Sequence, residues 1–134
     1  MLFETKSEVD IHEMSPLALA FVGDAVLELL VRSKLVGTTR LQPNRLHTVA
    51  THYVSAHAQS QELEILEPLL TEAEASVLRR GKHASKASVA KHATVQEYRA
   101  STGFECLLGW LYLQGRNVRI QVLFDALWAG YQPT

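Results

Sequence analysis

Apolar residues recur along most of this chain at the spacing of three and four positions that is typical of amphipathic helices, and no segment alternates long enough to predict a strand. The first helix is expected in "PLALAFVGDAVLELLVR". Ser15 is its N-cap, Pro16 takes the first helical position, where a missing N–H costs nothing, and the helix should end at Gly37. Because apolar residues cover nearly its whole circumference, this helix is predicted to be buried.

Start and stop signals predict four further helices. Two threonines, each followed three residues later by a glutamate, form capping boxes that open two of them. The expected helices cover residues 16–36, 43–67, 71–81, 94–114 and 117–128, with a basic connection over 82–92. The chain is therefore predicted to be a single all-α domain, a helical bundle over residues 1–134, with 1–14 as a loose N-terminal extension.

Composition changes this picture little. The 134 residues are 47% hydrophobic and 20% charged, which is ordinary for a globular chain. No apolar run approaches the roughly 18 residues that a membrane span needs, so no membrane partner is expected. The N-terminal segment has no apolar stretch that would predict a secretory signal, and the one cysteine, Cys106, excludes an internal disulfide. These features favour a cytoplasmic protein.

Charge is unevenly distributed along the chain. The segment 79–99, "RRGKHASKASVAKHATVQEYR", holds six Lys or Arg residues and one acid, whereas the whole chain has a net charge of −1. Such asymmetry indicates one basic surface on an otherwise acidic molecule, which nucleic acid could contact. A solvated basic loop accounts for the same pattern, and composition alone does not choose between them.

The aspartate of the first helix has an unusual setting. Asp24, Glu28 and Arg32 follow one another at intervals of four residues and share a stripe. An ordinary ion pair accounts for Glu28 and Arg32. It does not account for Asp24, which has apolar residues above and below it and is therefore expected to be buried. A buried carboxylate is costly unless it is paired or binds a metal.

A second isolated acid lies in the helix predicted over 94–114. Glu105 opens the apolar run of "STGFECLLGWLYLQG", and Gly109 lies one turn beyond it, as Gly23 lies beside Asp24. A glycine inside a helix is unfavourable, so two glycines beside two isolated acids indicate that these helices cross closely. Asp24 and Glu105 would then meet. An oxygen-only pair of this kind favours a hard cation, Mg²⁺ or Mn²⁺.

These residues resemble a known family. "LAFVGDAVLELLVR" and "YRASTGFECLLGWLYL" are similar to the two signature helices of the ribonuclease III catalytic domain, and "LQPNRLH" and "LRRGKHA" look like its compact branch, Mini-ribonuclease III, which lacks a double-stranded RNA-binding domain. The resemblance covers about Pro16 to Gly115.

The resemblance implies a homodimeric, Mg²⁺-dependent endoribonuclease that hydrolyses phosphodiester bonds in double-stranded RNA. Its implied role is the maturation of ribosomal RNA from the 23S precursor. A ribosomal protein that presents the substrate is a candidate helper. Asp24 and Glu105 match the family's catalytic, metal-binding acids. Phe21 matches an aromatic residue at the dimer interface, and Leu19 and Val22 are further interface candidates. The expected RNA-binding residues are Arg79, Arg80, Lys82, His83, Lys86 and Lys91.

The chain departs from the longer enzymes of that family at three positions. Thr102 stands where they have an aspartate, and Ala20 and Leu17 stand where they have glutamates. Two carboxylates per subunit predict one firmly held Mg²⁺ that keeps several waters. Three histidines at five-residue intervals rotate around a helix instead of sharing a face, so they are not expected to bind metal and receive no role: His47, His52 and His57.

Two other functions stay open on sequence grounds. A non-catalytic RNA-binding ribosome-assembly factor on the same fold is the alternative, although it would not need both acids. A Mg²⁺-dependent nucleotide pyrophosphohydrolase would need clustered acids at helical spacing, for which "EVDIHE" and "ELEILE" are the only candidates.

Overall fold

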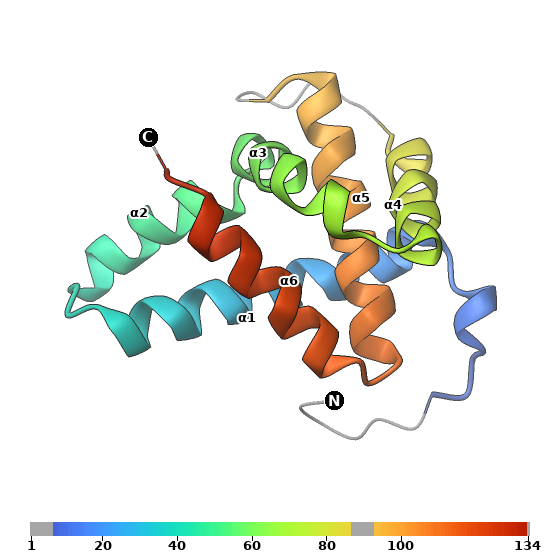
Figure 1. The fold of residues 1–134 in the computed structure, drawn as a ribbon, viewed down its shortest axis with the longest axis horizontal. Helices are drawn as coiled ribbons and strands as arrows, with labels where there is room; N and C mark the ends of the chain where they lie inside the picture. Colours follow the sequence, from blue (N-terminus) through green and yellow to red (C-terminus); the bar gives the residue numbers. More distant parts are fainter. Residues whose placement is uncertain (1–6, 87–92, 134) are drawn as a thin grey trace.

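The computed structural model describes residues 7–86 and 93–133 of the chain. Within these ranges the chain folds into α-helices and two short 3-10 helices, with no strand, which confirms the all-α prediction (Figure 1). In chain order the elements are η1 (Ile11–Glu13), α1 (Pro16–Thr38), α2 (Pro43–Val54), α3 (Ala56–Leu66), η2 (Glu67–Leu69), α4 (Glu72–Ala84), α5 (Val95–Leu113) and α6 (Asn117–Gly130).

Local capping signals place most helix ends close to where the sequence predicts them. The Ser15 side chain accepts a hydrogen bond from the Ala18 N–H at the start of α1. Both capping boxes form, with Thr71 opening α4 and Thr94 opening α5. Gly115 adopts a positive φ of 72° just after α5, a conformation that glycine reaches without strain. These ends depend only on residues within one turn, so the sequence predicts them well.

The long helix expected over 43–67 is wrong, because it is two helices. Ser55 has an extended backbone between α2 and α3. Its N–H still bonds to the Thr51 carbonyl at the end of α2, while its side chain accepts a hydrogen bond from the Ala58 N–H at the start of α3. One serine therefore ends the first helix and caps the second. The break turns α3 towards α5, whereas α2 follows the C-terminal half of α1 away from α5 (Figure 1).

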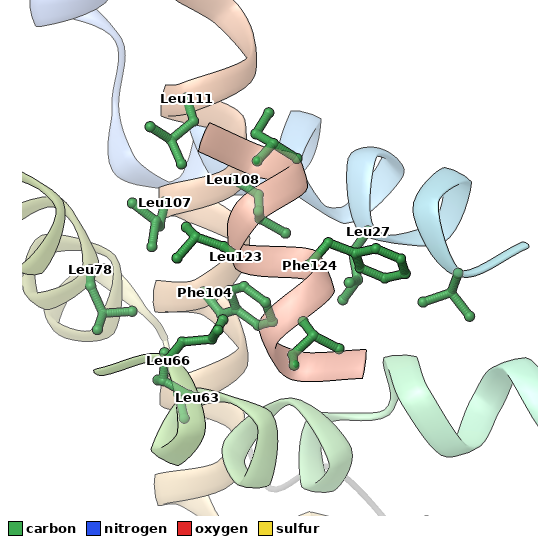
Figure 2. Close-up of a cluster of buried hydrophobic side chains, with 14 of the residues drawn as sticks. Leu27, Leu63, Leu66, Leu78, Phe104, Leu107, Leu108, Leu111, Leu123 and Phe124 are labelled. Atoms are coloured by element: carbon green, nitrogen blue, oxygen red, sulfur yellow. The ribbon is translucent and has the colours of Figure 1, made fainter. Parts of the chain in front are cut away.

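The core is built around α5, which lies between the other helices (Figure 1). Its buried face carries Phe104, Leu107, Leu108 and Leu111 (Figure 2). Buried leucine and phenylalanine side chains from α1, α3, α4 and α6 meet this face, among them Leu27, Leu63, Leu66, Leu78, Leu123 and Phe124. Burial of this apolar area is the main favourable contribution to folding. Because α5 is surrounded on most sides, its residues are held in fixed positions.

Among the described residues, no helix combines the length and the hydropathy that crossing a membrane requires.

Candidate active site

The two isolated acids lie where α1 and α5 cross. A Cβ atom added to Gly23 would lie 1.6 Å from the carbonyl oxygen of Glu105, and one added to Gly109 would lie 1.9 Å from the carbonyl oxygen of Leu19. Neither helix can hold a side chain at these positions, because backbone meets backbone there. The structure thus confirms that the two glycines mark a close helix crossing.

This crossing brings Asp24 and Glu105 into one site, as predicted. The pKa of the Glu105 carboxyl is raised to about 8. Burial is the largest cause, a hydrogen bond from Gln59 acts in the opposite direction, and the negative charges of Asp24 and Glu28 raise the pKa further. A carboxyl group that senses a neighbouring carboxylate in this way holds its proton unless a cation replaces it.

The prediction that Asp24 is buried is wrong for the single chain. Asp24 is exposed, and Glu105 is half-buried. The same side of α1 carries Phe21, which is 83% exposed, and Leu17, which is also exposed. The apolar pattern of α1 covers two surfaces: one packs on α5 within the chain, and the other stays open. A helix that is apolar all round is therefore not evidence of burial inside its own chain.

A buried glutamine contacts the Glu105 carboxylate, and no sequence pattern predicts this contact. The Nε2 atom of Gln59 donates to Glu105 Oε2 at 3.2 Å and to the Val54 carbonyl at 3.0 Å. Gln59 is 2% exposed and reaches Glu105 because the break at Ser55 turns α3 towards α5. In sequence it is one amide in a polar stretch, and nothing nearby distinguishes it from a surface residue.

The donor set of the site fits a hard cation. Two carboxylates supply oxygen ligands only, which suits Mg²⁺ or Mn²⁺ that keeps several waters. Among the described residues no group of three or more His, Cys, Asp or Glu side chains is arranged to hold a metal. Thr102 adds no ligand, since its hydroxyl donates to the Tyr98 carbonyl at 3.1 Å and is hydrogen-bonded with Ser85 Oγ at 3.2 Å. The site therefore offers two protein ligands.

Two of the three histidines spaced at five-residue intervals make contacts away from this pair of acids. His57 Nδ1 forms a hydrogen bond with the Glu97 carboxylate on the first turn of α5. His47 lines a cavity of about 240 Å³ between α1 and α2, together with Glu28 and Arg32. Glu28 and Arg32 form the predicted ion pair at 3.1 Å. The structure thus places these two histidines at other contacts.

The predicted RNA-binding residues lie mostly on α4 and just after it. Arg79, Arg80, His83 and Lys86 are exposed, and Lys82 is half-buried beside Glu67, 3.4 Å from its carboxylate. Lys91 lies outside the described residues. Helix α4 packs directly on α5, since a Cβ atom on Gly81 would lie 2.8 Å from the Cα atom of Gly103. The basic helix is therefore a neighbour of the helix that carries Glu105.

The predicted interface residues separate into two groups. Phe21 is open to solvent, and Val22 is partly buried. Leu19 is 2% exposed and packs in this chain's own core with Ala20, Val77 and Cys106. It has no surface to offer to a second subunit, so the expectation does not hold for Leu19.

The fold agrees with what known proteins show. The family described as Ribonuclease III domain matches residues 17–116. The chain therefore belongs to the ribonuclease III family and is an endoribonuclease of a family that acts on double-stranded RNA.

Its relatives narrow the assignment to the compact branch. A Mini-ribonuclease 3 of Brevibacillus brevis is 44% identical over 115 residues, which cover 86% of this chain and 86% of that protein. A Mini-ribonuclease 3 of Staphylococcus aureus is 37% identical over 126 residues, which cover 92% of this chain and 94% of that protein. The crystal structure of protein FN1578 from Fusobacterium nucleatum has a TM-score of 0.81 at 27% identity, covering 90% of this chain and 97% of that one. The expected resemblance is confirmed.

Proposed function

We propose that this chain hydrolyses phosphodiester bonds in double-stranded RNA with Mg²⁺ held by Asp24 and Glu105, and that Mn²⁺ can replace Mg²⁺. The enzyme would act as a homodimer in the cytoplasm. Its substrate would be ribosomal RNA precursor, the 23S precursor. One observation carries the proposal: the backbone contact of α1 with α5 brings together two acids that have no cationic partner among the described residues. Acids placed in this way repel each other, and a cation between them removes the repulsion.

Each residue of the site has a distinct task. When bound, Mg²⁺ activates a water molecule and neutralises charge that develops on the phosphate. Asp24 and Glu105 hold it, and Gln59 fixes the orientation of the Glu105 carboxylate through its hydrogen bond at 3.2 Å. Glu105 must lose its proton to become a ligand, so cation affinity rises with pH up to the pKa of about 8.

The basic side chains of α4 suit the backbone of duplex RNA. Lys and Arg side chains neutralise phosphates whatever the base sequence, and A-form RNA offers shape and 2′-hydroxyls more readily than base edges. Arg79, Arg80, His83 and Lys86 are exposed beside α5, and Lys82 is half-buried next to them. They would contact the backbone of the substrate, so sequence preference should be modest.

A homodimer is supported by the open face of α1. Phe21 and Leu17 form exposed apolar surface next to Asp24. A two-fold axis through this face would cover Phe21 and bring two sites together, so that each cuts one strand. A ribosomal protein that presents the RNA remains part of the proposal.

Cleavage of a labelled RNA duplex tests the proposal, with and without Mg²⁺, for the wild type and Glu105→Gln. We expect both strands to be cut only with Mg²⁺, and the variant to lose at least about a hundredfold in rate, because it lacks a charged ligand. Glu64→Gln is the matched control, since Glu64 is an exposed glutamate of α3, and its rate should equal that of the wild type. Cleavage without Mg²⁺, or by Glu105→Gln at the control's rate, would contradict the metal site. Binding without cleavage would favour the assembly factor.

A further inference from the structure

Helix α3, which supplies Gln59 to the candidate active site, also carries a glutamate, Glu62, that has no charged partner among the described residues. Glu62 of α3 is 0% exposed. Neither of its carboxyl oxygens has a hydrogen-bond partner among residues 7–86 and 93–133, and the same holds for Oε1 of Gln59. Three buried oxygens without partners on one helix are unusual, because nearly all buried polar atoms in native proteins are paired.

The side-chain amide of Gln59 can point in only one way. Its Nε2 atom donates to two acceptors, the Val54 carbonyl and Glu105 Oε2, so the opposite atom, Oε1, must face away from both. Turning the amide over would place an oxygen against two oxygens. Glu62 lies three residues along α3, on the same face of the helix as Gln59. The orphaned Oε1 therefore needs a donor, and Glu62 is the titratable residue of α3 whose spacing places it on the same face as Gln59.

The surroundings of Glu62 favour a neutral carboxyl group. It forms no ion pair within the described residues. Two phenols are close enough to sense its charge, Tyr53 of α2 and Tyr131 after α6. Burial raises the pKa of each, and a negative charge on Glu62 would raise both further. Burial raises the pKa of Glu62 itself to about 9. A neutral carboxyl group carries one O–H, which is the donor that Gln59 lacks.

We propose that Glu62 is a positioning residue that donates its carboxyl proton to Gln59 Oε1 and thereby holds the Gln59 amide in the orientation that presents Nε2 to Glu105. Glu62 touches neither substrate nor cation in this arrangement. It acts through Gln59, and the inference rests on the proposed role of Glu105 as a cation ligand. Hydrogen bonds that orient a metal ligand from behind commonly change metal affinity by about ten- to a hundredfold.

The test measures Mn²⁺ binding by water-proton relaxation, without RNA and without turnover. Glu62→Leu removes the donor and fills the space, and Glu62→Gln keeps a donor that cannot ionise. Gln59→Leu removes the acceptor, and the double variant Gln59→Leu/Glu62→Leu completes the cycle. Glu64→Leu on the exposed side of α3 is the control for a general effect of substitution. The side-chain amide signals of Gln59 in ¹⁵N-edited spectra report its orientation directly, and urea unfolding checks that each variant is folded.

We expect Glu62→Leu to weaken Mn²⁺ binding about tenfold and to shift the Gln59 amide signals, while Glu62→Gln stays within about twofold of the wild type. The double variant should bind no more weakly than Gln59→Leu alone, because both changes break one chain of contacts. Equal binding by the wild type and Glu62→Leu, or additive losses in the double variant, would overturn the role of Glu62. If the wild type binds Mn²⁺ no better than Glu105→Gln does, the metal site itself fails instead. Should Glu62→Leu not fold, Glu62→Met, which also removes the donor, takes its place in the binding and amide measurements.

Discussion

Two glutamates of this protein are wholly buried, yet they are in opposite states. Glu74 accepts hydrogen bonds from Arg119 Nε and Nη2, both at 2.8 Å, and from the Thr71 N–H at 2.9 Å. These contacts, with the Arg119 hydrogen bond as the largest cause, lower its pKa. Glu62 has no such partner among the described residues, and burial raises its pKa to about 9. Of two carboxyl groups without exposed surface, the one with a cationic partner is therefore charged and the other is neutral.

The difference shows how strongly a charged partner decides what a buried acid does. Glu74 joins two parts of the fold, because Arg119 lies on α6 and also donates to the Leu69 carbonyl at 2.8 Å. Its role is structural. Glu62 contributes no such link, and an unpartnered buried carboxyl is unfavourable for folding. A residue that is unfavourable for stability, on the helix that supplies Gln59 to the active site, is a candidate for a functional role.

The largest expected effect on stability comes from removing the cationic partner of Glu74, which leaves Glu74 without a partner as Glu62 is. Arg119→Met should leave a buried carboxylate without its cation and lower the free energy of unfolding by about 3 kcal/mol. Arg116→Met is the matched control, because Arg116 is exposed and only its distant charge acts on Glu74. Urea unfolding at neutral pH measures both. A loss in Arg119→Met as small as that in Arg116→Met would show that Glu74 does not depend on its partner.

An effect that is smaller per pH unit concerns the pH dependence of stability. The folded-state pKa of Glu62, about 9, lies above its ordinary value of 4.5, so the folded protein keeps a proton that the unfolded chain has lost. Its contribution to stability must therefore fall as pH rises between these values, by up to about 1.4 kcal/mol per pH unit. Glu62→Gln removes this contribution and should flatten the fall in stability measured by urea unfolding between about pH 5 and 8.

Glu74→Gln is the contrasting variant for that measurement. The pKa of Glu74 is lowered, so its contribution to stability is present above its ordinary pKa and is lost as pH falls through the lowered value. Glu74→Gln should therefore change the acid side of the stability curve and leave the slope above about pH 5 close to that of the wild type. The same slope in Glu62→Gln and the wild type would mean that Glu62 is ionised in the folded protein.

The smallest effect is expected at the surface. Lys82 lies 3.4 Å from Glu67, and both side chains are partly exposed. Lys82→Ala should change the free energy of unfolding by less than about 0.5 kcal/mol, because water screens such a pair. If Lys82 meets a phosphate, the same variant should also bind duplex RNA with a weaker salt dependence. The slope of the logarithm of the binding constant against the logarithm of the salt concentration should fall in magnitude by about one. A stability loss comparable to that of Arg119→Met would contradict the distinction between buried and exposed pairs, and an unchanged salt dependence would remove Lys82 from the RNA-binding surface.

The sequence predicts well those features that depend on nearest neighbours along the chain. The two capping boxes form as their spacing indicates. The close crossing of α1 and α5 is also readable, because a glycine weakens a helix and is favoured in its interior where another backbone comes too close for a side chain. These signals, with the resemblance to the ribonuclease III family, suffice to identify Asp24 and Glu105 as the candidate metal-binding acids.

Other features depend on which distant residues meet. The break at Ser55 escapes prediction because an extended serine leaves no mark in a helical pattern. The approach of Gln59 to Glu105 and of Arg119 to Glu74 joins residues that are 46 and 45 positions apart. The exposure of Asp24 depends on the side of α1 that α5 leaves open.

The sequence by itself thus determined the helices, most of their ends and the pair of acids, because hydrogen bonds within one turn and apolar periodicity are local. Only the tertiary structure decided the charge state of each buried acid. That state depends on whether a donor or a cation from another helix reaches the acid through a low-dielectric interior, as Arg119 reaches Glu74 and no cation among the described residues reaches Glu62.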